Sequence, residues 1–190
     1  MSNENPRVYG QGPYGVVVVH GGPGAPGYMA PVARELARDW GVLEPLQTAP
    51  SLEGQVQELR GALERHAELP VTLIGSSWGA MLSFVAAARY PAMARKLVLV
   101  GSTVFEERYA ADIEGTRLSR LSDDERAEVQ SLIEGLDDPT IKNKDTLFGR
   151  RGDLFTKADA YSPLTLDLEL LESQYHLYRS VWKDAAKLRR

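Results

Sequence analysis

The sequence has 190 residues, of which 43% are hydrophobic and 25% charged, which is typical of a globular protein long enough for one core. Its net charge of −4 gives no basic field that would favour nucleic acid, and no apolar run approaches the roughly 20 residues of a membrane-spanning helix. The absence of cysteine excludes disulfides and fits a reducing compartment. We therefore expect a cytoplasmic protein with no nucleic-acid or membrane partner.

Strand and helix patterns alternate through the first half of the chain. Short apolar, branched stretches predict four strands, at residues 14–20, 41–47, 70–75 and 95–102. Apolar residues at helical spacing predict three helices between them, at residues 28–40, 51–63 and 77–91. Ser51 is the expected N-cap of the second helix. This alternation predicts an α/β fold, a parallel sheet with helices on its faces.

The second half, from about Phe105, has no convincing strand and predicts helices. Ser122 and Glu125 form a capping box ahead of an apolar face made by Val129, Leu132, Ile133 and Leu136. The polar stretch 143–163 is predicted to be a loop. A long final helix is predicted after it, with one face made by Leu168, Leu171, Tyr175, Tyr178 and Trp182.

The third predicted strand runs into GSSWGA, residues 75–80, which matches Gly-x-Ser-x-Gly with Ser77 at its centre. A nucleophile elbow requires this order of strand, sharp turn and helix, because the turn lifts the serine hydroxyl above the sheet edge. Gly75 and Gly79 avoid side chains that would collide with the neighbouring strand and helix. The following helix directs its N-terminus at the serine and favours negative charge there. Ser77 is therefore the candidate nucleophile.

The first predicted strand runs into HGGPG, residues 20–24, whose glycines can expose backbone amides. Acyl transfer needs two N–H groups directed at the developing oxyanion. We expect one from Trp78, which follows the serine, and one from Gly22. Gly21 and Gly24 are candidate substrate-binding residues. The simpler alternative, a tight turn and an ordinary helix start, leaves unexplained why both motifs end predicted strands.

Together, HGGPG and GSSWG resemble the α/β-hydrolase superfamily and, within it, the proline iminopeptidase-like branch. That branch typically carries HGGPG and GGSWG, so Ser76 here replaces a glycine. The segment YPAMARKLVLVGS is also similar to the passage that follows the elbow in that family. The resemblance covers residues 7–102. It implies an α/β-hydrolase fold with a core at residues 1–104 and a helical lid at residues 105–190.

The same resemblance assigns roles to the motif residues. It implies that Ser77 is the nucleophile, that Gly22 and Trp78 supply the oxyanion hole, and that His20 is structural. The family carries its acid and histidine on loops after two further strands beyond the lid. No Gly-Asp-x-Asp or Gly-His segment follows the predicted lid, so we expect the C-terminal strands to be missing, in an incomplete chain or half of a split enzyme.

Residues within the chain that could replace this pair have simpler interpretations. His176 lies on the final predicted helix, and Glu106 and Glu107 follow the fourth predicted strand. All three are expected to be polar residues of solvated helices. His66 ends the helix before the third strand and is expected at the opposite end of the sheet from Ser77. Without a base, a serine hydroxyl is a poor nucleophile at neutral pH.

Two function hypotheses remain open. The first is a serine hydrolase that forms an acyl-enzyme with a small amide, ester or short peptide, and needs no cofactor and no metal. The second is a catalytically inactive binding module that kept the backbone cradle and lost the acid and base. Peptidase, esterase and carbon–carbon hydrolase activities are not distinguished. In the resembling family, acidic lid residues select an N-terminal amine, and candidates here are Asp112, Glu114 and Asp159.

Two further expectations concern packing. The aromatic residues Trp78, Tyr175, Tyr178 and Trp182 could line a substrate pocket, but an aromatic stripe at helical spacing favours core packing. The fourth predicted strand, KLVLVG, would form an open sheet edge that is apolar on both faces. Such an edge invites pairing, so we expect self-association, a complementing C-terminal fragment or marginal stability.

Overall fold

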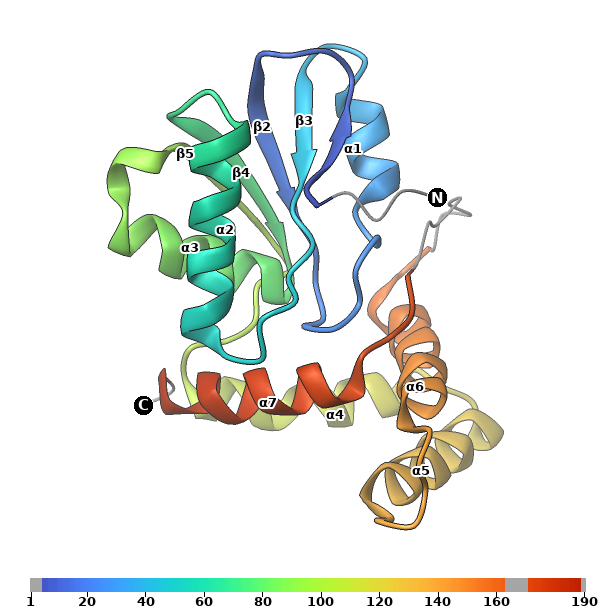
Figure 1. The fold of residues 1–190 in the computed structure, drawn as a ribbon. Helices are drawn as coiled ribbons and strands as arrows, with labels where there is room; N and C mark the ends of the chain where they lie inside the picture. Colours follow the sequence, from blue (N-terminus) through green and yellow to red (C-terminus); the bar gives the residue numbers. More distant parts are fainter. Residues whose placement is uncertain (1–4, 163–170, 189–190) are drawn as a thin grey trace.

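A five-stranded sheet forms the centre of the computed structural model, which describes residues 5–162 and 171–188 (Figure 1). The strand order is β1-β3-β2-β4-β5. The strands are β1 (Arg7–Tyr9), β2 (Tyr14–Val19), β3 (Gly41–Glu44), β4 (Val71–Ser76) and β5 (Ala94–Val100). Strands β2 to β5 are parallel, which confirms the predicted sheet. The antiparallel strand β1 was not predicted, because three residues are too few for a periodic pattern.

Helices flank the sheet and, together with the loops between them, make up the described part of the second half. They are α1 (Ala30–Leu36), α2 (Leu52–His66), α3 (Trp78–Arg89), α4 (Glu107–Ser119), α5 (Asp123–Asp137), α6 (Lys144–Asp159) and α7 (Tyr175–Ala185), with 3-10 turns at Pro91–Met93 and Ala186–Leu188. Both predicted caps are confirmed. The Ser51 hydroxyl accepts a hydrogen bond from Gly54 N at 3.0 Å, and the capping box of α5 is complete.

Two predictions about the second half are wrong. The predicted loop at 143–163 is largely helix α6, because Leu154, Phe155 and Ala158 gain burial against neighbouring helices that a local pattern does not reveal. The final helix begins only at Tyr175, so Leu171 precedes it. Leu168 lies outside the described residues.

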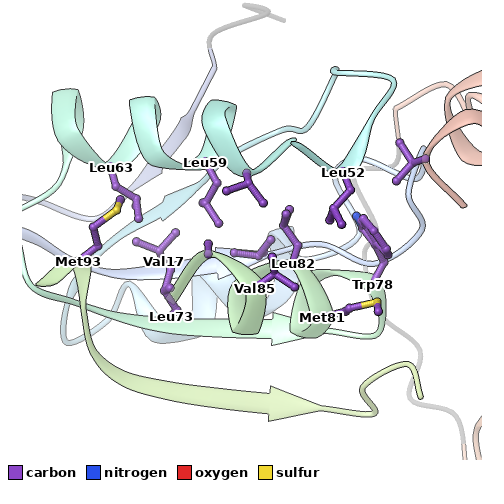
Figure 2. Packing of buried hydrophobic residues seen from close by; sticks show 14 of the residues in the cluster. Val17, Leu52, Leu59, Leu63, Leu73, Trp78, Met81, Leu82, Val85 and Met93 are labelled. Carbon is purple, nitrogen blue, oxygen red and sulfur yellow. The ribbon is translucent and has the colours of Figure 1, made fainter. Parts of the chain in front are cut away.

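The valines of β2 show how the sheet divides the core into two layers. Val17 and Val19 face α2 and α3, whereas Val16 and Val18 face α1, as the period of two in a strand requires. Figure 2 shows the first layer, with side chains of α2 and α3 packed against β2 and β4. A strand buried on both faces explains the unbroken run of branched residues.

The helices after β5 do not form one separate body. Helices α4, α5 and α6 share a small apolar cluster, but α7 packs onto the first core through Leu177, Val181 and Ala185. Figure 1 shows α7 passing beside the lower ends of α2 and the sheet. The Asp184 carboxylate also accepts a hydrogen bond from Leu52 N at 3.1 Å. The domain boundary between residues 104 and 105 stays a prediction.

Strand β5 lies at the edge of the sheet, where the sequence placed an open edge. Val98, Leu99 and Val100 are 41%, 42% and 52% exposed, so this apolar strand is covered far less than β2. Within the described residues, no helix has the length and apolar character needed to cross a membrane.

Candidate active site

The two glycine-containing motifs meet at the C-terminal ends of neighbouring strands. Val19 of β2 pairs with Gly75 of β4, so HGGPG and GSSWG leave the sheet side by side. From β2 the chain crosses to β3 on one side and then returns to β4 on the other. Parallel sheets bind ligands at such a switch point, outside the carboxyl ends of the strands. The topology therefore places both motifs where a site is expected.

Ser77 adopts a strained backbone conformation between β4 and α3. Its φ of 52° and ψ of −116° make it the only non-glycine residue with positive φ in the described part of the chain. Such a conformation costs about 1–3 kcal/mol and persists where the surroundings impose it. Ser77 N donates to Val100 O at 2.9 Å, which ties the turn to β5. The side chain is half-buried at the start of α3.

Gly75 and Gly79 allow the close packing that this turn needs. A Cβ on Gly79 would lie 2.1 Å from the carbonyl oxygen of Val19, and a Cβ on Gly75 would lie 2.3 Å from that of Gly79. Both neighbours are backbone atoms, which cannot rotate away. The glycines are therefore required where α3 starts against the ends of β2 and β4.

The HGGPG turn lies directly against the candidate nucleophile. A Cβ on Gly21 would lie 3.2 Å from Ser77 Cβ and 3.9 Å from Ser77 Oγ. Gly22 has a φ of 118°, a conformation that favours glycine. Trp78 is the first residue of α3, and N–H groups in a first helical turn have no partner within the helix. The geometry thus brings Gly21 and the start of α3 to Ser77, whereas the role of Gly22 stays a prediction.

His20 is a packed structural residue. It is fully buried, and its ring contacts Gly21 O through Nδ1 at 2.7 Å and Gln47 N through Nε2 at 3.3 Å. Because Gln47 N is a donor, Nε2 accepts, and the neutral ring carries its proton on Nδ1. Burial lowers the pKa of His20 to about 4. The ring therefore fixes the start of the HGGPG turn.

This buried imidazole predicts a loss of stability in mild acid. The pKa of His20 is about 4 folded and near 6.5 unfolded, so the unfolded chain binds the extra proton between these values. The free energy of unfolding should fall by about 3 kcal/mol as pH drops from 7 to 4. Urea unfolding of wild type and His20→Asn at several pH values measures this decrease. The variant should lack the part of the pH dependence that comes from His20. His66→Asn, at an exposed histidine, is the control. An identical pH dependence in wild type and His20→Asn would contradict the assignment.

The indole of Trp78 anchors the residue that follows the nucleophile. It is fully buried, and its Nε1 donates to Gln55 Oε1 at 2.7 Å. Its ring packs edge-on against Trp182 with centroids 5.2 Å apart, and Tyr178 lies 6.3 Å from Trp182. These contacts support the expected core packing of the aromatic stripe.

A segment before α7 covers the HGGPG turn. Gln174 N donates to Gly24 O at 2.9 Å, and Leu171 N donates to Pro26 O at 3.1 Å. Asp145 Oδ1 then accepts from Tyr175 N at 2.7 Å at the start of α7. A contact between Gly24 and substrate stays a prediction. These long-range contacts have no local signal in the sequence.

The hydrogen bonds and positions of the three histidines do not engage Ser77. His20 is held by Gly21 and Gln47, and His66 is exposed at the end of α2, before β4 starts. His176 is exposed on α7. Among the described residues, none of them hydrogen-bonds to Ser77.

The candidate acids have other surroundings. Glu106 pairs with Arg108 at 2.7 Å, and Asp159 pairs with Arg117 through two hydrogen bonds. Asp112 and Glu114 are exposed on α4. The site thus combines a strained serine with an adjacent glycine turn, and no described side chain is hydrogen-bonded to Ser77 as a base.

Comparisons with known proteins agree with this architecture. A family model described as alpha/beta hydrolase fold matches residues 54–143. No curated protein matches the chain. A carboxylesterase structure from Nitrososphaera gargenis matches at a TM-score of 0.58 and 16% identity, covering 98% of this chain and 71% of that one.

Two further solved structures match the chain. VinJ matches at a TM-score of 0.57 and 19% identity, covering 88% of this chain and 69% of VinJ. An epoxide hydrolase from Bacillus megaterium matches at a TM-score of 0.56 and 15% identity, covering 97% of this chain and 71% of the epoxide hydrolase. The protein has the α/β-hydrolase fold, as the two motifs predicted.

Proposed function

We propose that this protein is a serine hydrolase of the α/β-hydrolase class that acts on a small amide or ester. Ser77 is the nucleophile, and the N–H groups of Gly22 and Trp78 form the oxyanion hole. The observation that carries the proposal is the strained turn at Ser77, whose hydroxyl lies against the Gly21 backbone. Backbone strain at a polar side chain, next to a glycine turn, supports a functional role.

In the proposed reaction, Ser77 Oγ attacks the substrate carbonyl carbon and forms a tetrahedral intermediate. The oxyanion is stabilised by the two backbone donors, a contribution typically of about 3–4 kcal/mol per donor. Collapse releases the amine or alcohol and leaves an acyl-enzyme, which water hydrolyses. The serine proton must pass to a base. Since no histidine hydrogen-bonds to Ser77 among the described residues, we propose that a complementing segment supplies the acid and the base.

Labelling with a fluorophosphonate probe tests this proposal. We expect slow labelling of the chain alone, at least tenfold faster labelling when millimolar imidazole provides a base, and none in Ser77→Ala. Ser76→Ala, at the preceding serine, should label like wild type. Labelling that persists in Ser77→Ala would refute the assignment.

The alternative function is a binding module that retains the fold without catalysis. It is favoured by the absence of a base at Ser77 among the described residues. It predicts no labelling even when imidazole is added, in a protein whose unfolding remains cooperative. The same labelling experiment therefore separates the two functions.

We propose an ester or an amide as the substrate class. The carboxylesterase among the structural matches favours an ester, whereas the proline iminopeptidase-like motifs favour an amide after an N-terminal residue. Asp112 and Glu114, exposed on α4, are the candidate groups for recognising a free amine. Hydrolysis of matched anilides with free and acetylated amines would distinguish these substrates.

We also propose that β5 pairs with a second strand, in another copy or a complementing fragment. Its exposed apolar residues and edge position support this partner surface. Sedimentation velocity should show concentration-dependent association, and Val98→Lys should weaken it by about tenfold or more. Val8→Lys, on the opposite edge strand and 49% exposed in wild type, is the matched control. A wild-type monomer at all concentrations would exclude pairing between copies.

A further inference from the structure

A cleft lies between the start of α7 and the start of α6. Its volume is about 280 Å³, and it is lined by Lys142, Lys144, Asp145, Tyr175, His176 and Arg179. The segment before α7 continues to Gln174, which hydrogen-bonds to Gly24. The cleft is thus close to the HGGPG turn but contains none of its residues.

The charges around this cleft are unbalanced. It is lined by three cationic side chains and one carboxylate in a chain whose net charge is −4. Within the described part of the chain, Lys142 and Arg179 form no ion pair, and both are exposed. In contrast, Arg150 and Lys157 of α6 each pair with a glutamate.

The remaining two charged groups are already engaged by the protein. Lys144 Nζ donates to Leu136 O at 2.6 Å, which keeps its ammonium beside the cleft. The Asp145 carboxylate accepts from Tyr175 N and so offsets the positive N-terminus of α7. Among the described residues, the positive charges of Lys142 and Arg179 have no ion-pair partner.

We propose that this cleft binds a phosphate group. The planar fork of Arg179 can donate two parallel hydrogen bonds to phosphate oxygens, while Lys142 and Lys144 act as point charges. His176 adds a ring N–H on the same wall. A phosphate monoester carries close to two negative charges, which matches the local excess better than a single carboxylate. The site is independent of the chemistry proposed at Ser77.

Isothermal titration at constant ionic strength tests this site with inorganic phosphate and with phenyl phosphate. We expect saturable binding that weakens at least tenfold in Arg179→Gln and in Lys142→Gln. Lys183→Gln is the matched control, since Lys183 is an exposed lysine of α7 outside the cleft. Circular dichroism of each variant confirms that loss of binding is not loss of fold.

The outcomes distinguish the source of the phosphate. Equal affinity for the two probes indicates free phosphate as the ligand, and tighter binding of phenyl phosphate indicates phosphate carried on an organic molecule. No saturable binding in wild type, or equal binding in all variants, would overturn the proposal. Ser77→Ala should bind phosphate like wild type, so failure of the hydrolase proposal leaves this result interpretable.

Discussion

Gly79→Ala is expected to destabilise the protein by about 3 kcal/mol or more, although it adds a single methyl group. That methyl would lie 2.1 Å from Val19 O and 2.6 Å from His20 O, both backbone atoms at the end of β2. Relief requires α3 to move away from the sheet, which breaks the packing of Trp78 and Met81. Since domains of this size are stable by about 5–15 kcal/mol, the change is severe. The urea midpoint measured by circular dichroism should fall sharply.

Gly115→Ala is the control for the added methyl group. Gly115 is exposed on α4, and a Cβ there would meet nothing within 4 Å. Alanine has the higher helix propensity, so this variant should be more stable by up to about 1 kcal/mol. Equal urea midpoints for Gly79→Ala and wild type would show that α3 does not start against β2 as described.

Gly21→Val is expected to slow fluorophosphonate labelling of Ser77 about a hundredfold while leaving the protein folded. The new Cβ would lie 3.2 Å from Ser77 Cβ and 3.9 Å from Ser77 Oγ, so the branched side chain adds bulk beside the hydroxyl. Displacing a reacting group by about 1 Å can cost a factor of 100 in rate. Labelling is measured in the presence of imidazole, so that both proteins have a base.

Gly15→Val is the control, because it makes the same substitution in β2, the strand that leads into the HGGPG turn. Gly15 lies in β2 with nothing within 4 Å of its Cβ position, so labelling should be unchanged. Gly21→Val labelling at the wild-type rate would mean that the turn does not shape access to Ser77.

The sheet and the elbow could be predicted because their signals are local. The run of branched residues at Val16–Val19 predicts a strand buried on both faces. The glycines at positions 75 and 79 fit the tight turn that the Gly-x-Ser-x-Gly motif predicts. In the second half, the capping box at Ser122 and the apolar face after it located α5 correctly.

The failures involve contacts that are distant in sequence. Helix α6 is polar over most of its length and is stabilised by packing on α5, so its local pattern resembles a loop. The bond between Gln174 and Gly24 joins positions 150 residues apart, and no composition or spacing anticipates it. The base for Ser77 likewise could not be predicted, because it depends on which group approaches Ser77 in the folded structure.

A crystal structure of the protein phosphonylated at Ser77 would show directly whether two backbone amides form the oxyanion hole. We expect the phosphonyl oxygen to accept hydrogen bonds from the N–H groups of both Gly22 and Trp78, at about 2.7–3.1 Å. An adduct whose oxygen points to solvent, with those two amides bound elsewhere, would contradict it.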